Sequence, residues 1–185
     1  MMLVLGPLRV SGSSSVPPKG GLLILSNHIA DIDPPVVGIA CRRRIHFMAK
    51  SELFEIPILK HVIRWFQAFP VKRGAPDKAA IRHAIDLLQA GEVVCIFPEG
   101  QLSEDSLLQP LLPGAALIVR KAGVPVVCCG LRNTNRVMPY RTVFPRPAWC
   151  FTYAKWGEAR TFDKGESAEE ILAWADGQLR ALTGQ

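Results

Sequence analysis

The chain of 185 residues lacks an apolar stretch long enough to span a bilayer. Its longest strongly apolar run without charge, residues 107–119, has 13 residues and two prolines, whereas a spanning helix needs about 20 apolar residues. The N-terminal residues Met-Met-Leu-Val-Leu are too few for a secretory signal peptide. Internal repeats and low-complexity tracts are also missing, and apolar (49%) and charged (21%) residues are in ordinary balance. We therefore expect a single globular domain over residues 1–185.

Cysteine is scarce, and its number argues against a disulfide framework. The five cysteines are an odd number and three of them lie in apolar runs, so we expect reduced core residues in a cytosolic protein. The patterns His-x-His, Cys-x-x-Cys and His-x-x-x-His, which are typical of metal sites, are also absent. The cysteines are Cys41, Cys95, Cys128, Cys129 and Cys150.

Negative charge is in short supply, because 22 lysines and arginines face 16 aspartates and glutamates, which gives a net charge of +6. Such a balance predicts an anionic partner: nucleic acid, an anionic membrane or a phosphorylated substrate. No recognised nucleic-acid-binding motif occurs in the sequence. We therefore expect no nucleic-acid partner.

The positive charge is concentrated between residues 42 and 73. This segment has eight basic and two acidic residues and also contains Trp and Phe, a composition suited to the surface of an anionic bilayer. We expect peripheral binding to the cytoplasmic face of a membrane; the alternative is a solvated basic face beside an ordinary core helix. The basic residues are Arg42, Arg43, Arg44, Lys50, Lys60, Arg64, Lys72 and Arg73.

Apolar runs alternate along the chain with segments of helical periodicity. The runs predict strands at residues 8–10, 22–26, 45–49, 69–71, 93–97, 124–131 and 149–154. Helices are predicted at residues 34–41, 57–66, 76–90, 113–122 and about 168–182. Pro76 and Pro113 are placed to open two of these helices, Gly91 and Gly123 to close them, and Ser167–Glu170 is a capping box. This alternation indicates the α/β class, with a mostly parallel central sheet covered by helices on both faces.

The stretch Ser26–Pro35 places an amide, an imidazole and two carboxylates directly after a buried strand, where open α/β sheets bind ligands. On a continuous helix His28 and Asp33 would lie about 140° apart. We therefore expect a turn that brings Asp33 back to His28, with Asp33 also capping the helix that begins at Pro34. A carboxylate bound to one imidazole nitrogen leaves the other nitrogen as a base.

Two other interpretations of this stretch stay open. In the first, Asp33 only caps the helix and His28 is an incidental loop residue. In the second, His28, Asp31 and Asp33 are the metal ligands of a hydrolase.

Two further segments combine glycine with charged side chains at the end of a predicted strand. In the first, Lys72 and Arg73 precede Gly74, and such a turn suits an anion because arginine binds phosphate through its planar guanidinium. In the second, Glu99 precedes Gly100 and is a candidate to accept hydrogen bonds from substrate hydroxyls or to orient a basic residue. Taken alone, each segment also fits an ordinary turn.

In order, the chain presents Asn-His-x-x-x-x-Asp from residue 27, Lys-Arg-Gly from residue 72, Phe-Pro-Glu-Gly from residue 97 and Val-Pro-Val from residue 124. This series resembles the glycerolipid acyltransferase family, and most of all its 1-acylglycerol-3-phosphate acyltransferases. The resemblance covers residues from about 8 to about 155, and the first and third motifs are its specific parts.

The resemblance implies that His28 is the catalytic base and Asp33 its orienting partner. It also implies that an acyl group moves from acyl-CoA or acyl carrier protein to a lysophospholipid hydroxyl, without a metal, another cofactor or an acyl-enzyme. These roles agree with elementary chemistry, because an attacking hydroxyl must lose its proton and histidine accepts one near neutral pH. Ser26 is the only nucleophile nearby and lacks a Gly-x-Ser-x-Gly elbow, which favours direct transfer. By the same resemblance, the acceptor binds to Lys72, Arg73, Gly74, Phe97, Pro98, Glu99 and Gly100.

The sequence departs from the family pattern at two points. Phe-Pro-Glu-Gly is usually followed by Thr-Arg-Ser, but Leu102 stands at the Arg position, so acceptors other than lysophosphatidic acid come into question. Many members have membrane helices before the first motif, whereas the first strand predicted here begins at residue 8, so we expect a truncated or peripheral form. Two alternatives of other classes stay open: a metal-dependent hydrolase, and a non-catalytic module that binds lipid or acyl carrier protein.

Overall fold

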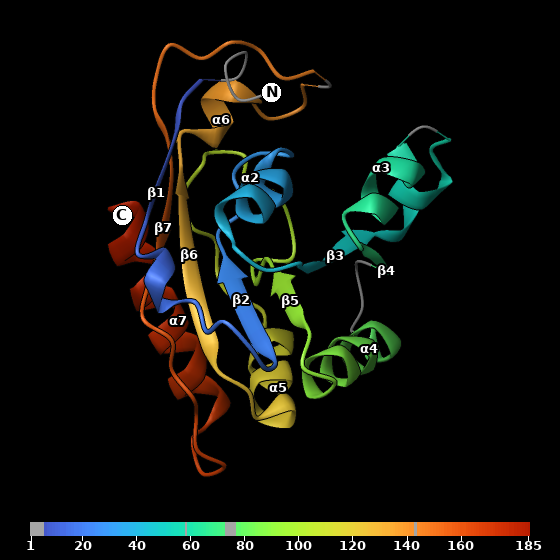
Figure 1. Cartoon of the computed structure of the whole chain (residues 1–185), viewed down its shortest axis with the longest axis vertical. Helices are drawn as coiled ribbons and strands as arrows, with labels where there is room; N and C mark the ends of the chain where they lie inside the picture. The colour runs from blue at the N-terminus through green and yellow to red at the C-terminus, as the bar shows by residue number, and fades with distance from the viewer. Residues whose placement is uncertain (1–5, 58, 73–76, 143) are drawn as a thin grey trace.

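The computed structural model describes residues 6–57, 59–72, 77–142 and 144–185. Within these ranges the strands are β1 (Leu8–Ser11), β2 (Leu22–Ser26), β3 (His46–Lys50), β4 (Phe69–Val71), β5 (Val93–Ile96), β6 (Val126–Arg132) and β7 (Thr152–Trp156). They form one sheet in the order β1-β7-β6-β2-β5-β3-β4 (Figure 1). Neighbouring strands are parallel except for β6 and β7. The prediction of a mostly parallel α/β sheet is confirmed.

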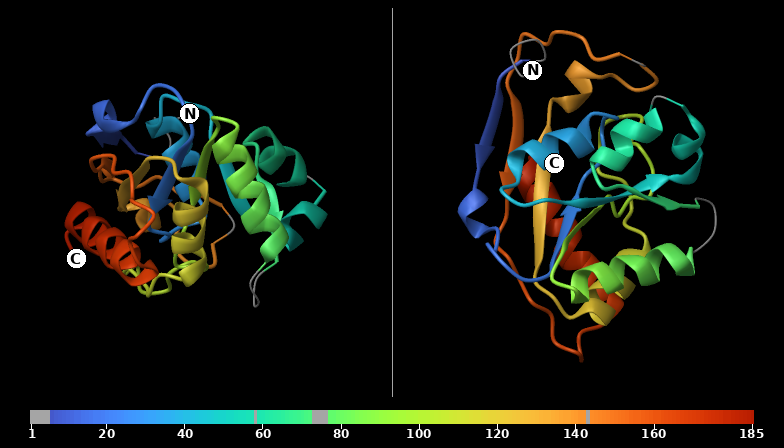
Figure 2. Two further views of the ribbon diagram at one scale, coloured as in Figure 1. Left: turned by 90° about the horizontal axis from the view of Figure 1, so that it is seen from below. Right: turned by 45° about the vertical axis from the view of Figure 1, so that its right-hand side comes forward.

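Helices cover both faces of this sheet, as the sequence predicts. The described residues form α2 (Asp33–Ala40), α3 (Leu59–Trp65), α4 (Lys78–Gln89), α5 (Pro113–Ala122), α6 (Thr134–Val137) and α7 (Ala168–Thr183), and the short 3-10 turns η1 (Ser13–Ser15) and η2 (Ser51–Glu55). In Figure 2, α7, α5 and α4 lie side by side on one face of the sheet, and α2 lies on the other.

Strand β2 lies at the centre of the sheet and shows why an unbroken apolar run produces this fold. Leu22 and Ile24 pack in the cluster that contains α2, whereas Leu23 and Leu25 pack with α4, α5 and α7. All four side chains are at most 1% exposed, because helices cover both faces of a parallel sheet. Burying one such side chain stabilises the fold by about 1.5–3 kcal/mol. These four residues thereby fix the position of the polar loop that follows them.

The sequence signals at helix ends are mostly confirmed. Helix α5 begins at Pro113 and ends before Gly123, whose φ of 63° is left-handed. Helix α7 starts from the capping box Ser167–Glu170. Pro76, the residue predicted to open α4, lies outside the described residues, and the Asp77 carboxylate caps that helix by accepting two backbone amides.

Some boundaries differ from the prediction. Strand β7 begins at Thr152 rather than at residue 149, because its pairing with β1 starts there, and Trp149 lies in the loop before it. Strand β6 begins at Val126 rather than at residue 124. The helix predicted at residues 57–66 is shorter and follows η2, and the sequence pattern does not predict α6.

The cysteines are free thiols, and four of them are buried. Burial raises the pKa of Cys41, Cys95 and Cys129, and raises that of Cys128 to about 12. These four thiols are therefore packing groups that carry no thiolate at neutral pH. Cys150 differs from them in being half-buried.

One cation of the basic segment expected to meet a membrane, Arg43, is engaged by the protein's own backbone. The Arg43 guanidinium donates hydrogen bonds to the carbonyls of Pro17, Gly20 and Gly91, which precede the amino ends of β2 and β5. Arg43 is half-buried, and its charge ties its own loop to the loops before β2 and β5. The membrane contact expected of the segment stays a prediction. Helix α3, in contrast, has no buried residue, and Trp65 is 78% exposed. In the described part of the chain, no helix is both long and apolar enough to cross a membrane.

Candidate active site

The first and third motifs meet at one edge of the sheet. Strands β2 and β5 are parallel neighbours, and Leu25 lies opposite Ile96 at their carboxyl ends. The loop that carries His28 and the loop that carries Glu99 therefore leave the sheet side by side. This is the edge where open α/β sheets place their ligands.

The turn predicted between His28 and Asp33 is confirmed. The distance between His28 Nδ1 and Asp33 Oδ2 is 3.0 Å, and the same oxygen accepts the backbone amides of Ile29 (2.6 Å) and Ala30 (2.8 Å). Asp33 is fully buried, and within the described residues its Oδ1 has no hydrogen-bond partner. The capping role predicted for Asp33 is wrong: Ile32 occupies the cap position of α2, because the carboxylate turns back onto the amides before the helix.

The imidazole of His28 is held on two sides. Its ring stacks on Phe97 with the ring centroids 4.1 Å apart and the planes inclined by 22°. Its side chain is 9% exposed, and among the described residues Nε2 has no hydrogen-bond partner. Asp33 accepts a hydrogen bond from Nδ1–H, so the neutral ring has its lone pair on Nε2. Phe97, which the resemblance assigns to the acceptor site, thus fixes the plane of the histidine ring; its contact with the acceptor stays a prediction.

Glu99 connects the two loops through backbone amides. Its Oε1 accepts the amide of His28 and its Oε2 accepts the amide of Gln109, both at 2.8 Å. The Ser103 amide in turn donates to the His28 carbonyl at 2.8 Å. Burial raises the pKa of Glu99, against the lowering effect of the two amides. These contacts make Glu99 a positioning residue for His28, and a direct contact with the acceptor stays a prediction.

Pro98 and Gly100 shape the second loop. The carbonyl of Pro98 accepts the Leu112 amide at 2.8 Å. Gly100 has a φ of 72°, and a Cβ at this position would lie 2.3 Å from Leu112 Cδ1. Only glycine fits both the backbone conformation and the space. These contacts are with Leu112, and the contact of Pro98 and Gly100 with the acceptor stays a prediction.

The sequence of these loops is that of a known family. The family model called Acyltransferase matches residues 7–132, a range that contains both loops. The chain belongs to this acyltransferase family. It is 32% identical over 123 residues to a 1-acyl-sn-glycerol-3-phosphate acyltransferase of Bacillus subtilis, an alignment that covers 66% of this chain and 61% of that protein. It is 29% identical over 125 residues to an N-acylphosphatidylethanolamine synthase of Arabidopsis thaliana, with 61% of this chain and 44% of that protein covered.

The fold of this acyltransferase-family chain also occurs in a solved structure. The crystal structure of the 1-acyl-sn-glycerophosphate acyltransferase PlsC from Thermotoga maritima superposes with a TM-score of 0.80 at 24% identity, covering 96% of this chain and 71% of that one. The chain spans about 61% of the length of the Bacillus relative. The resemblance drawn from the four motifs is confirmed at the level of family and fold.

The basic motif of this family member lies farther along the same edge. Strand β4 is three strands away from β2, which corresponds to about 14 Å. Lys72 follows β4, is exposed, and its amide donates to Asp77 Oδ2 at 2.9 Å. Arg73 and Gly74 lie outside the described residues. Leu102, at the position where the family pattern has Arg, is half-buried.

Sequence reasoning missed several residues that support the site. The side-chain amide of Asn27 pairs with the backbone of Leu131 in both directions, at 3.0 and 2.7 Å. The buried Ser26 hydroxyl donates to the Cys129 carbonyl at 2.8 Å, so this hydroxyl is already engaged. Polar residues at the very end of a buried strand were the signal for both. Gln109, ten residues beyond Glu99, carries no such signal.

The metal-site interpretation of the first motif is not supported by the arrangement of its residues. The described residues contain no group of three His, Cys, Asp or Glu side chains placed to hold a metal ion. The structure brings His28 and Asp33 together, whereas Asp31 is exposed.

Proposed function

We propose that this chain is an O-acyltransferase that transfers a fatty acyl group from acyl-CoA or acyl carrier protein to the hydroxyl of a lysophospholipid. The first acceptor to consider is 1-acylglycerol-3-phosphate, in phospholipid biosynthesis. The observation that carries this proposal is the buried His28–Asp33 pair, whose Nε2 has no partner among the described residues, in a member of the acyltransferase family. The names of its relatives, such as the Bacillus protein, support the choice of acceptor.

In the proposed reaction, Nε2 of His28 takes the proton of the acceptor hydroxyl as its oxygen attacks the thioester carbonyl. A carbon–oxygen bond forms, the carbon–sulfur bond breaks, and the proton passes from the imidazolium to the leaving thiolate. Asp33 holds the tautomer and stabilises the imidazolium. A base positioned in this way contributes about 10²–10⁴-fold to the rate. The engaged hydroxyl of Ser26 supports direct transfer without an acyl-enzyme, and the scheme uses no cofactor.

We assign the acceptor headgroup to the end of β4. Lys72, Arg73 and Gly74 would bind a phosphate there, and Phe97, Pro98, Glu99 and Gly100 would form the wall beside His28. Because Leu102 stands where the family pattern has an arginine, Arg73 would contribute a larger share of the phosphate binding. The acyl chain of the acceptor stays in the membrane, and the protein binds to its cytoplasmic face.

The test is a panel of acceptors incubated with labelled acyl-CoA or acyl carrier protein and analysed by mass spectrometry. The panel contains 1-acylglycerol-3-phosphate, other lysophospholipids, a monoacylglycerol and phosphatidylethanolamine, the last because one relative is named for N-acylation of that lipid. We expect transfer by the parent and by His46→Gln, a matched control at the opposite end of the sheet, and loss of transfer in His28→Ala. Absence of transfer to every acceptor would favour the non-catalytic lipid-binding module.

A further inference from the structure

The loop between α6 and β7 carries the most exposed aromatic side chains of the described chain. Trp149 is fully exposed and Phe144 is 81% exposed; Trp65 of α3 follows at 78%. Large apolar side chains that gather on a surface mark an interaction site. We call residues 138–151, of which residue 143 is not described, the lip.

Two hydrogen bonds tie the backbone of the lip to neighbouring residues. The amide of Arg146 donates to the Val137 carbonyl at 2.8 Å, and the side chain of Asn133 donates to the Phe151 carbonyl at 2.8 Å. Three prolines restrict the backbone between these points. The aromatic rings are therefore exposed on a loop whose backbone is restrained.

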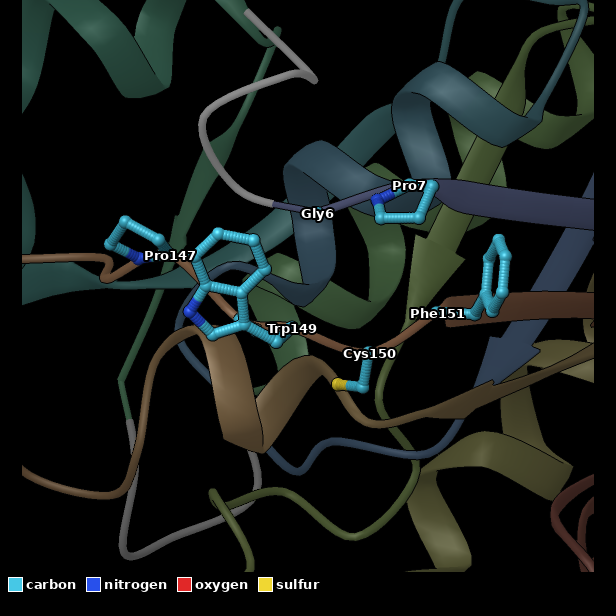
Figure 3. Close-up of a pocket in the computed structure, with 7 residues that line it drawn as sticks. Gly6, Pro7, Pro147, Trp149, Cys150 and Phe151 are labelled. Carbon is cyan, nitrogen blue, oxygen red and sulfur yellow. The ribbon is translucent and has the colours of Figure 1, made fainter.

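An apolar hollow of about 350 Å³ lies under the lip. Figure 3 shows the Trp149 ring and the Phe151 ring on two sides of it, with Pro7 and Pro147 nearby, and no residue that lines it carries a charge. The Arg9 guanidinium stacks over the Phe151 ring at 3.7 Å from its centroid. The surface thus combines an apolar hollow with one cation stacked on a ring that lines it.

The charge of the lip selects an anionic partner. The sequence has no acidic residue between Asp105 and Glu158, whereas the lip and α6 expose Arg136, Arg141 and Arg146. A carboxylate does approach from the neighbouring loop, where Glu104 accepts the Tyr140 hydroxyl at 2.6 Å. Tryptophan and phenylalanine beside arginine are the composition of segments that lie in the headgroup region of a bilayer.

The lip stands at the same edge of the sheet as the candidate active site. Strand β6 ends and the antiparallel β7 begins at the edge where β2 and β5 end. In Figures 1 and 2, the lip and α3 lie at this end of the molecule, with α2 and the end of β2 between them. An acceptor that leaves a bilayer at this edge would meet the loop of His28.

We propose that the lip docks this edge onto an anionic lipid bilayer. Trp149 and Phe144 enter the boundary between headgroups and acyl chains, and Arg136, Arg141 and Arg146 bind lipid phosphates. This inference rests on the proposed function, because an enzyme that uses lysolipids must hold its active site against the membrane that contains them. The observation behind it is an aromatic and basic loop that lies well beyond the basic motif in the sequence. It is therefore independent of the segment between Arg42 and Arg73.

The test is flotation of the purified chain with vesicles of phosphatidylcholine, with and without phosphatidylglycerol. The variant Trp149→Ala/Phe144→Ala should lower partitioning into vesicles at least about 10-fold, because it removes two rings that the bilayer would bury. Arg141→Gln/Arg146→Gln should lower it about 25-fold on anionic vesicles, at about 5-fold per cation, and leave neutral vesicles unchanged. The controls on α5, Arg120→Gln/Lys121→Gln and Leu117→Ala, remove exposed cations and an exposed apolar group away from the lip and should partition as the parent.

Three results would overturn the docking surface. The parent could fail to bind anionic vesicles, the lip variants could bind as the parent does, or the α5 controls could lose as much binding as the lip variants. Light scattering is a separate measurement: self-association that disappears with Trp149→Ala would overturn the proposal and assign the lip to a second copy of the chain. Flotation uses no substrate, so its outcome stands whether or not acyl transfer is found.

Discussion

Replacing Glu99 with glutamine tests whether this residue positions the catalytic loop or binds the acceptor. The two carboxylate oxygens each accept a backbone amide, a buried one from His28 and a partly buried one from Gln109. Glutamine has a single acceptor oxygen, so its NH₂ group must face one of these amides. The loss of a hydrogen bond to a charged group costs about 1.5–3 kcal/mol. For a chain of this size, that lowers Tm by about 3–12 °C.

The kinetic effect separates the two roles. A displaced His28 loses reaction geometry, and a misplacement of about 1 Å costs about 100-fold in rate. We therefore expect a fall in kcat of about 10- to 100-fold with KM unchanged, measured with the acceptor found in the panel. A raised KM with kcat retained would refute this reasoning and assign Glu99 to the acceptor. Glu169→Gln, an exposed substitution in α7, is the matched control and should stay within about 0.5 kcal/mol of the parent.

The pH dependence of stability gives a second check on Glu99. Burial raises its pKa in the folded state, so folding favours the protonated carboxyl. This contribution is fully present below the unfolded pKa and is lost as the pH rises through the folded pKa. Chemical denaturation should therefore show that the difference in unfolding free energy between the parent and Glu99→Gln narrows as the pH rises from the unfolded pKa of Glu99 through its folded pKa. A difference that widens instead would mean that the two amides outweigh burial.

Three other predictions concern the chemistry of the site. His28→Ala should lower acyl transfer by about 10²–10⁴-fold, and Asp33→Asn should lower kcat by losing control of the tautomer; near-parental turnover in His28→Ala would remove it as the base. Arg73→Ala should weaken a phosphate acceptor by about 10- to 150-fold in kcat/KM, through loss of a charge-assisted hydrogen bond worth about 1.5–3 kcal/mol. An uncharged monoacylglycerol is its control, and equal slowing of both acceptors would refute the headgroup assignment. Chelation with EDTA should leave transfer unchanged, whereas loss that one divalent ion restores would return the hydrolase interpretation.

Short-range patterns predicted the parts of this structure that depend on neighbours in sequence. The run Leu22–Leu25 indicates a strand covered on both faces. Gly123 marks a helix end through its left-handed φ, and Ser167 marks a helix start through the side chain that accepts the Glu170 amide. The five-residue spacing from His28 to Asp33 excludes a common helical face and so predicts the turn. These inferences succeed because each rests on local geometry.

Features that depend on distant contacts or on exposure could not be predicted in this way. The Gln109 amide donates its hydrogen bond to Glu99 across an irregular loop, and hydrophobic periodicity does not predict the path of such a loop. The apolar letters at Trp149–Phe151 suggest a strand, yet composition alone does not distinguish a buried side chain from an exposed one. For Arg43, the sequence shows a charge but not the three backbone carbonyls that accept its hydrogen bonds.

The unequal burial of the cysteines makes the natural chain ready for site-selective labelling. Four thiols are enclosed by the sheet and its helices, and their raised pKa values withhold the reactive thiolate. Cys150 alone is half-buried, and it lies in the hollow beside Trp149. A maleimide fluorophore should therefore couple at this one position without prior mutagenesis. Its emission would then report, in real time, when the lip passes from water into lipid.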